Sequence, residues 1–191
     1  MNLTDTHTHN PEAGPEAIIN IEPDALPLPA TGRFSTGVHP WRSPEAAKLW
    51  RMVETAASDD RIVAIGECGI DRLRGADIKL QEELFMRHAR LAERVGKPLI
   101  IHCVKAWGEL LGAYSDIKPS QPWIIHGFRG GPALAHQLLD AGMHISLGEH
   151  FNLATAAIIP DDRLHIETDC STLPIGDIAE AVRQARKPHT D

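Results

Sequence analysis

Five segments of this chain share one feature: each reads as a short β-strand, and each stops at residues that can bind a metal ion. The first carries the motif Asp-Thr-His-Thr-His at positions 5–9, directly after an apolar start at residues 1–3. Side chains alternate between the two faces of a strand, so His7 and His9 point the same way and can hold one ion between them. The other four segments are residues 61–67, 98–102, 122–126 and 163–169, which end at Glu67, His102, His126 and Asp169.

The sequence between these segments predicts a parallel sheet with helices outside it. Residues 62–65 form a continuous apolar run, which is typical of a strand buried on both faces. Further strands are predicted at residues 17–21, 34–38 and 143–147, and helices at residues 43–57, 77–95, around 110–111, 133–139, 151–158 and 178–185. The alternation gives about eight strands, and the candidate ligands lie at the C-terminal ends of strands, where barrel enzymes build their sites.

The predicted fold class is therefore α/β, a TIM-type (β/α)8 barrel in shortened form. Such a barrel usually needs roughly 250 residues, with about 200 as a lower limit, and this chain has 191. Five prolines in residues 11–29 exclude a long helix there, because proline clashes inside a helix. We expect a barrel that lacks one or two N-terminal helices, and we expect residues 1–191 to form a single domain.

Six strand-end residues form the candidate metal centre. They are His7, His9, Glu67, His102, His126 and Asp169. We expect His7, His9 and Asp169 to bind one ion, and His102 and His126 to bind a second. Imidazole and carboxylate ligands suit Zn, Mn, Ni or Fe, and carboxylate-rich sites also hold Mg. Six ligands exceed the needs of one tetrahedral site, so we expect two divalent ions roughly 3.5–4 Å apart, bridged by Glu67. Asp169 would also accept the proton of an attacking water, which makes Glu67 and Asp169 the candidate catalytic residues.

Other residues near these positions carry weaker signals. His39 either lines the site or turns the chain before Pro40. Glu167 and His165 share a face with Asp169 if their strand is regular; we expect Glu167, like Asp5 beside His7, to support a ligand. The histidines at positions 88, 136, 144 and 189 are expected to be ordinary helix, core or tail residues. The cysteines at positions 68, 103 and 170 each follow a candidate ligand, so they are expected to be small buried residues that point away from the site.

The composition argues against a protein that coats nucleic acid and against a membrane protein. A net charge of −7 argues against a broad surface that coats nucleic acid. No apolar run approaches the roughly 20 residues of a membrane span, and no signal peptide is apparent, so we expect no membrane contact. An odd number of cysteines without an export signal indicates a reducing compartment, and we expect a cytoplasmic protein with no obligate protein partner.

Taken together, the motifs resemble those of the TatD family of metal-dependent DNases and related hydrolases. The matching segments are residues 5–9, 37–40, 64–71, 100–102, 126–130 and 167–169, in the family's order. The resemblance implies an amidohydrolase-like TIM barrel, a divalent metal centre at the six residues above, and phosphodiester hydrolysis. Relatives usually have longer segments between the first and third strands. They also have a basic residue where this chain has Val104, next to Lys105, and commonly a serine at the position of Arg129.

The basic residues just after these strands suggest the substrate. Lys105 and Arg129, with Arg72 and Arg74, should lie on loops around the metals, and His39, Lys105 and Arg129 are the candidate substrate contacts. Aromatic residues make up only 5% of the chain, so a strand end or a short oligonucleotide of DNA fits better than a long base-stacking surface. The first hypothesis is a metal-dependent phosphodiesterase or nuclease that uses two ions (Mg, Mn or Zn). The alternatives are a small-molecule amidohydrolase for amides or lactones, and a non-enzymatic barrel that binds a metabolite or partner.

Overall fold

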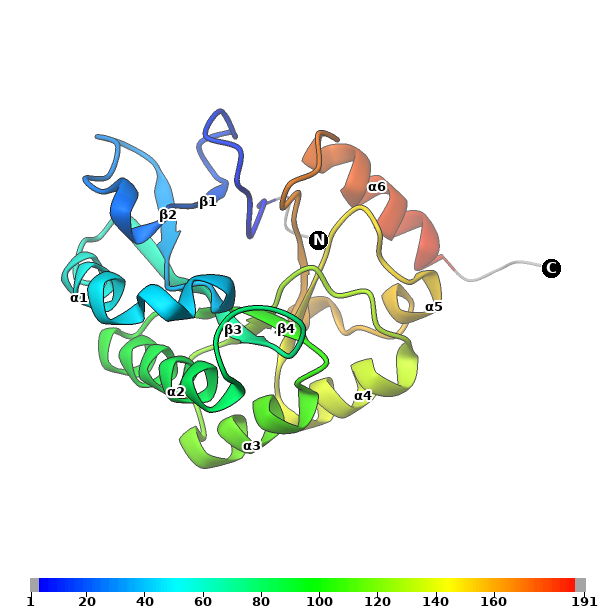
Figure 1. The fold of residues 1–191 in the computed structure, drawn as a ribbon. Helices are drawn as coiled ribbons and strands as arrows, with labels where there is room; N and C mark the ends of the chain where they lie inside the picture. Colours follow the sequence, from blue (N-terminus) through cyan, green and yellow to red (C-terminus); the bar gives the residue numbers. More distant parts are fainter. Residues whose placement is uncertain (1–3, 188–191) are drawn as a thin grey trace.

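Seven parallel strands form one curled sheet with helices on its outer side (Figure 1). The computed structural model describes residues 4–187. The strands follow chain order across the sheet: β1 (Ile18–Asn20), β2 (Arg33–Thr36), β3 (Ile62–Asp71), β4 (Leu99–Val104), β5 (Trp123–Ile125), β6 (His144–Leu147) and β7 (Leu164–Ile166). Every neighbouring pair is parallel, so all carboxyl ends lie at one end of the barrel.

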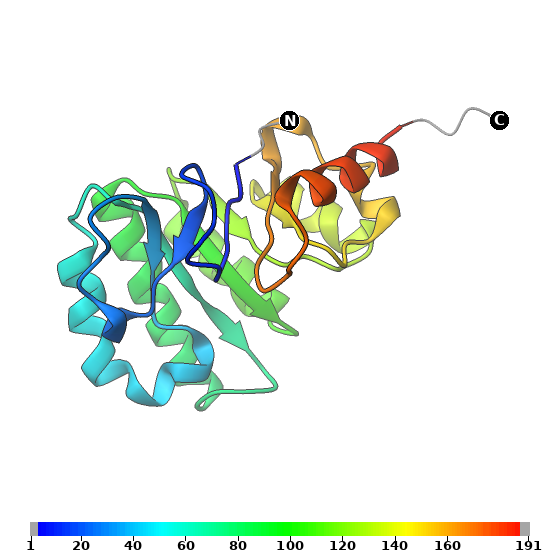
Figure 2. The ribbon, with the colours of Figure 1, turned by 90° about the horizontal axis from the view of Figure 1, so that it is seen from above.

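The N-terminal segment links the two edges of this sheet. Asp5 bridges to Ile166 at the end of β7, and Thr8 bridges to Ile19 of β1 and to Asp169. Figure 2 shows this dark blue segment passing between β1 and the chain that leads into the last helix. Isolated bridges stand in place of the regular strand predicted here, and residues 1–3 of that prediction lie outside the described part. Residues 5–8 nevertheless occupy the position of the first barrel strand.

The helices follow the predicted alternation. They are α1 (Ala46–Ala56), α2 (Ile78–Val95), α3 (Trp107–Ile117), α4 (Pro132–Ala141), α5 (Leu153–Ala156) and α6 (Ile175–Ala185), with short 3-10 turns η1 (Pro23–Ala25), η2 (Pro40–Glu45) and η3 (Asp161–Arg163). Asp77 caps the start of α2 by accepting from the Lys79 N–H at 2.9 Å, and Gly96 ends it with a left-handed φ of 67°. Within residues 4–187, no helix is both long and apolar enough to cross a membrane.

The N-terminal helices that the sequence predicted to be missing are absent from the described residues. Among the described residues, only loop connects residue 9 to β1, and only the turn η1 lies between β1 and β2. Loop residues Leu26 and Leu28 pack against the core there instead. The shortened TIM-type barrel is therefore confirmed.

Some boundaries differ from the prediction. Ser43 and Pro44 lie inside η2, and α1 begins at Ala46. The reason is local: the Ser43 hydroxyl donates to the Pro40 carbonyl at 2.6 Å and accepts the Ala76 N–H at 2.9 Å, so it is used in a turn and not as a helix cap. The strand predicted at residues 163–169 is shorter, Leu164–Ile166, and Asp169 has a left-handed φ of 51°, which a strand cannot contain. The strands predicted to end at Glu67 and His102 instead continue to Asp71 and Val104.

His88 joins α2 to the chain that enters the site. It is fully buried; its Nε2 accepts the Val38 N–H at 2.9 Å, and its Nδ1 lies 2.8 Å from the Leu84 carbonyl. Nε2 must therefore be unprotonated. Burial, and to a smaller extent the charge of Arg87, lowers the pKa of His88 from 6.5 to about 4.

This shift predicts a pH-dependent stability. The folded pKa lies below the unfolded one, so the unfolded chain binds more protons between the two values, and stability falls as pH drops from about 6.5 towards 4. The contribution of His88 should fall by about 2 kcal/mol between pH 7 and pH 5. His88→Gln keeps an acceptor but does not titrate. Urea unfolding at both pH values should show a smaller loss for the variant than for the wild-type chain, and equal losses would contradict the assignment.

Candidate metal centre

The buried carboxylate of Glu67 lies at the middle of the site. Its Oε2 is 3.4 Å from Nε2 of His7 and 3.4 Å from Nε2 of His9. Its Oε1 is 3.0 Å from Nδ1 of His102 and 2.8 Å from Nε2 of His126. The two oxygens of one side chain therefore face two separate pairs of imidazoles, which is the arrangement a bridging ligand requires.

Asp169 joins the group that contains His7 and His9. Its Oδ1 lies 3.8 Å from Nε2 of His7 and 3.6 Å from Nε2 of His9. Two backbone hydrogen bonds fix this proximity: the Asp169 N–H donates to the His7 carbonyl at 2.9 Å, and the His9 N–H donates to the Asp169 carbonyl at 3.0 Å. The structure thus brings all six predicted residues together, from the N-terminal segment to the loop beyond β7.

His39 lies in the same cluster. Its Nε2 is 3.1 Å from Oε1 of Glu67, and its ring packs against His102 with centroids 4.6 Å apart. Its Nδ1 accepts the Trp41 N–H at 3.2 Å, so His39 both lines the site and turns the chain into η2. The sequence left open whether His39 lines the site or turns the chain before Pro40, and in the structure it does both.

Three carboxylates outside the six hold the ligands in place. Glu167, fully buried, faces Nδ1 of His126 with Oε1 at 3.2 Å, in the supporting role predicted for it. Asp71 lies with Oδ2 3.3 Å from Nε2 of His102. Asp5 accepts from the Thr168 hydroxyl at 2.6 Å and from the Thr168 backbone N–H at 3.0 Å, so it supports the backbone at the site and not an imidazole ring.

Sequence reasoning missed Asp71, although a signal existed. Residues two apart on a strand share a face, so Glu67 and Asp71, four apart on β3, point the same way. It also missed Asn20, whose side-chain oxygen accepts the Glu67 N–H at 2.9 Å, because that contact joins β1 to β3 across the sheet. His165 contacts none of the six candidate ligands; its Nε2 lies 3.0 Å from Nδ1 of His144.

The cysteines follow the prediction in part. Cys68 is fully buried, and burial raises the pKa of its thiol well above the usual range. Burial also raises the pKa of Cys103 to about 12. Cys170 is exposed, contrary to the prediction, and it lies on the loop between β7 and α6. All three are free thiols.

The electrostatics of the centre favour added positive charge. Burial alone would raise the pKa of Glu67, but the charge of His126 and hydrogen bonds from His102, His126 and His39 hold it well below its usual range. Burial would likewise lower the pKa of His126, and the charges of Glu67 and Glu167 raise it well above its usual range instead. A proton or a metal ion can supply this charge.

The buried side chain of His7 indicates that a metal ion fits among these residues. His7 has a side chain that is 1% exposed, and neither ring nitrogen has a hydrogen-bond partner in the described part of the chain. Buried polar atoms are normally paired, since an unpaired one costs free energy. An ion among His7, His9 and Asp169, whose ligand atoms all lie within 4.8 Å of one another, would satisfy Nε2. The donor set therefore fits a metal centre.

Two cavities open beside the centre. One, of about 650 Å³, is lined by His102, His126 and Asp169 together with Lys105 and Arg129. The other, of about 170 Å³, lies over Asp169 and contains Arg129.

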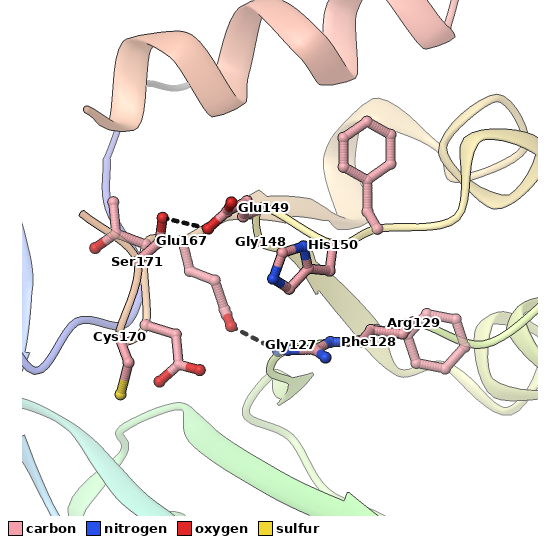
Figure 3. Close-up of a pocket in the computed structure, with 12 residues that line it drawn as sticks. Gly127, Phe128, Arg129, Gly148, Glu149, His150, Glu167, Cys170 and Ser171 are labelled. Carbon is pink, nitrogen blue, oxygen red and sulfur yellow. Dashed lines mark hydrogen bonds between the residues drawn. The ribbon is translucent and has the colours of Figure 1, made fainter. Parts of the chain in front are cut away.

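Figure 3 shows the smaller cavity, with Glu167 reaching towards the backbone N–H of Gly127, which it accepts at 2.6 Å. Ser171 donates to Glu149 at 2.7 Å at its edge. His150, which the sequence analysis did not consider, also lines this cavity.

Comparison with known proteins identifies the family of this chain. The family model described as TatD related DNase matches residues 26–186. The chain belongs to this family. It is 35% identical over 160 residues to the "3'-5' ssDNA/RNA exonuclease TatD" of Cronobacter turicensis, covering 74% of this chain and 59% of that protein. It is 33% identical over 153 residues to the "Uncharacterized metal-dependent hydrolase TatD" of Mycobacterium tuberculosis, covering 73% and 58%.

Solved structures of TatD proteins show the same fold. A TatD family hydrolase from Entamoeba histolytica aligns with a TM-score of 0.61 and 26% identity, over 72% of this chain and 50% of that one. YJJV, a TatD homolog from Escherichia coli, aligns with a TM-score of 0.74 over 95% of both chains, at 18% identity, which supports the fold alone. This TatD-family chain spans a little under three fifths of the two curated relatives named above.

The central position of Glu67 predicts the effect of its removal. Glu67→Ala should lower the metal content well below that of the wild-type protein, because Glu67 is the ligand that we expect two ions to share. Elemental analysis of the purified protein measures this. Glu149→Ala, which removes a carboxylate paired only to Ser171, is the matched control and should keep its metal. Unchanged metal in the Glu67 variant would remove the bridging role.

Proposed function

We propose that this chain is a metal-dependent phosphodiesterase that acts on single-stranded DNA ends or short oligonucleotides. The observation that carries the proposal is the Glu67 carboxylate, whose oxygens face His7 and His9 on one side and His102 and His126 on the other. A pair of sites about 4 Å apart is typical of enzymes that displace a group at phosphorus. The Cronobacter relative, whose name describes an exonuclease for single-stranded DNA and RNA, supports the same substrate class.

The six candidate ligands would hold two divalent ions, with Mg, Mn and Zn as candidates. Such ions, when bound, make water more acidic and stabilise charge on phosphate oxygens. Asp169 is positioned to accept the proton of the attacking water, because its side chain is one third exposed while its backbone is tied to His7 and His9. Glu167 and Asp71 keep His126 and His102 in fixed orientations.

The larger cavity favours a phosphodiester over a neutral amide. Lys105 and Arg129 are both exposed and line the cavity together with His102, His126 and Asp169. Two cations beside the metal residues suit an anionic substrate and would have no partner on a neutral one. They contact phosphates and do not read bases, so we propose little sequence preference.

A direct assay tests the function. The purified protein, loaded with Mg, Mn or Zn in turn, is given end-labelled single-stranded DNA, the matching duplex, and a panel of cyclic amides and lactones. We expect shortening of the single strand from an end, with slower loss of duplex. Hydrolysis of an amide or lactone without cleavage of DNA would favour the amidohydrolase alternative, and no turnover with any metal would favour a binding role.

Asp169→Asn is the first variant to measure. The amide keeps the shape of the side chain but is not a base, so kcat should fall by about 10²- to 10⁴-fold while KM changes little. Steady-state kinetics on a short oligonucleotide provides both constants. A kcat close to the wild-type value would move the proton acceptor to another group.

Arg129→Ser tests the phosphate contact. A guanidinium holds two phosphate oxygens at once, which a serine hydroxyl cannot do. Binding should weaken at unchanged metal content, and the slope of log affinity against log salt should flatten by about 0.7, the value for one contact to a single strand. Arg51→Ser, which removes the same charge from the exposed side of α1, is the control and should keep the wild-type slope. Equal slopes for all three proteins would make Arg129 a solvated loop charge.

We also propose a cytoplasmic location, because all three cysteines are free and a reducing compartment keeps them so. Fractionation of cells that produce the tagged protein would test this.

A further inference from the structure

An exposed tryptophan stands at the rim of the metal centre. Trp41, on η2, is 46% exposed. Its indole lies edge-on to His39, with ring centroids 4.8 Å apart at 82°, and to His102, at 5.8 Å and 77°. His39 in turn lies 3.1 Å from Glu67. The indole is thus one ring away from the central carboxylate, and it is accessible to a ligand.

The orientation of this indole is fixed. Its Nε1–H donates to Oδ2 of Asp71 at 2.6 Å, and Asp71 also accepts the Leu73 N–H at 2.8 Å. The backbone N–H of Trp41 donates to Nδ1 of His39 at 3.2 Å. A side chain held at both its backbone and its ring loses little freedom when a ligand binds, so contacts on its face contribute more to affinity.

A cation lies against the ring. The guanidinium of Arg74 is 4.4 Å from the centroid of Trp41. Within residues 4–187 no carboxylate forms an ion pair with Arg74, whereas its neighbour Arg72 pairs with Glu109. Arg74 is exposed, so its charge is available to a phosphate while its plane extends the stacking surface.

The loop that carries Arg74 is built to stay in place. The Gln81 side chain is 1% exposed, accepts the Asp71 N–H at 2.8 Å, and donates to the Arg74 carbonyl at 2.9 Å. Gly75 has a φ of 91°, and a Cβ there would lie 2.3 Å from the Pro40 carbonyl oxygen. Only glycine allows this close approach, which brings the loop against the residue that precedes Trp41.

We propose that Trp41 and Arg74 form a stacking subsite for one nucleobase of the substrate, next to the phosphate that is cleaved; this rests on the proposed function. Every base has a π-face, and single-stranded nucleic acid binds by stacking on aromatic rings and guanidinium planes. His102 contacts Trp41 and also lines the cavity with Lys105 and Arg129. A strand can therefore place phosphates along that cavity and one base against Trp41.

The subsite explains how a chain with few aromatic residues can recognise a strand end. One fixed ring beside the metals selects an unpaired base, which a duplex keeps inside its own stack. The subsite would not distinguish one base from another, because stacking involves no base edge.

The test uses a series of single-stranded DNA oligonucleotides, each with one abasic residue at a successive position from the cleaved end. The wild-type protein should show a drop in kcat/KM, roughly 5- to 100-fold, at a single position. Trp41→Leu should remove this discrimination, so that natural and abasic substrates are cleaved at equal rates. Trp41→Phe loses the bond to Asp71 but keeps a ring, and it should retain the discrimination. Leu73→Ala, which truncates an exposed side chain of the Arg74 loop, is the control and should behave as wild type.

The possible outcomes of this experiment distinguish a failure of the stacking subsite from a failure of the proposed function. Cleavage by the wild-type protein with no position-dependent drop, or a drop that survives in Trp41→Leu, overturns the subsite and leaves the nuclease function intact. Loss of discrimination in both Trp41→Leu and Trp41→Phe would mean that Trp41 acts through Asp71 and His102, which also overturns it. No cleavage of any oligonucleotide by the wild-type protein removes the proposed function and this inference with it.

Discussion

The site depends on the seam where the N-terminal segment meets the end of β7. Thr168 donates its hydroxyl to Asp5 at 2.6 Å, and the backbones of His7, His9 and Asp169 exchange hydrogen bonds across the seam. The same segment bonds to β1 through Thr8, whose N–H donates to the Ile18 carbonyl at 3.1 Å. Residues more than 150 positions apart in sequence therefore become neighbours, and half of the metal centre exists only because the barrel closes there.

Closure of the barrel brings together ionisable side chains that would be unfavourable to bury one at a time. Glu67 is 5% exposed and receives five imidazoles, so each group offsets the cost of burying the others. The supporting carboxylates Asp71 and Glu167 extend this balance outward and fix which ring nitrogen faces Glu67. The site is thus a network in which each buried charged group would be unfavourable alone, so removing one member should disturb both halves of the network.

The alternation of side chains along a strand explains which site residues could be predicted from the sequence and which could not. His7 and His9 share a face because they are two residues apart, and Glu67, His102 and His126 converge because their strands are parallel neighbours. The contacts of Asn20 and Trp41 join different elements, so no local spacing reveals them. Asp169 itself has a left-handed backbone and lies beyond the end of β7, so the alternation of side chains within that strand does not place it in the site. Local patterns pointed to the six candidate ligands, whereas the residues that orient these side chains became apparent only in the fold.

The loss of two outer helices leaves the centre intact for a physical reason. Helices of a barrel cover the outer face of the strands, whereas the ligands lie at the carboxyl ends, where hydrogen bonds between strands set their positions. Here loop residues Leu26 and Leu28 pack against the core in place of a helix, and Arg42 of η2 pairs with Asp24 of the adjoining turn η1 at 2.7 Å. A loop can replace a helix as a cover because burial requires only apolar contact and satisfied backbone groups. It cannot replace a strand, since only a strand fixes the register that brings Asn20 to the backbone of Glu67.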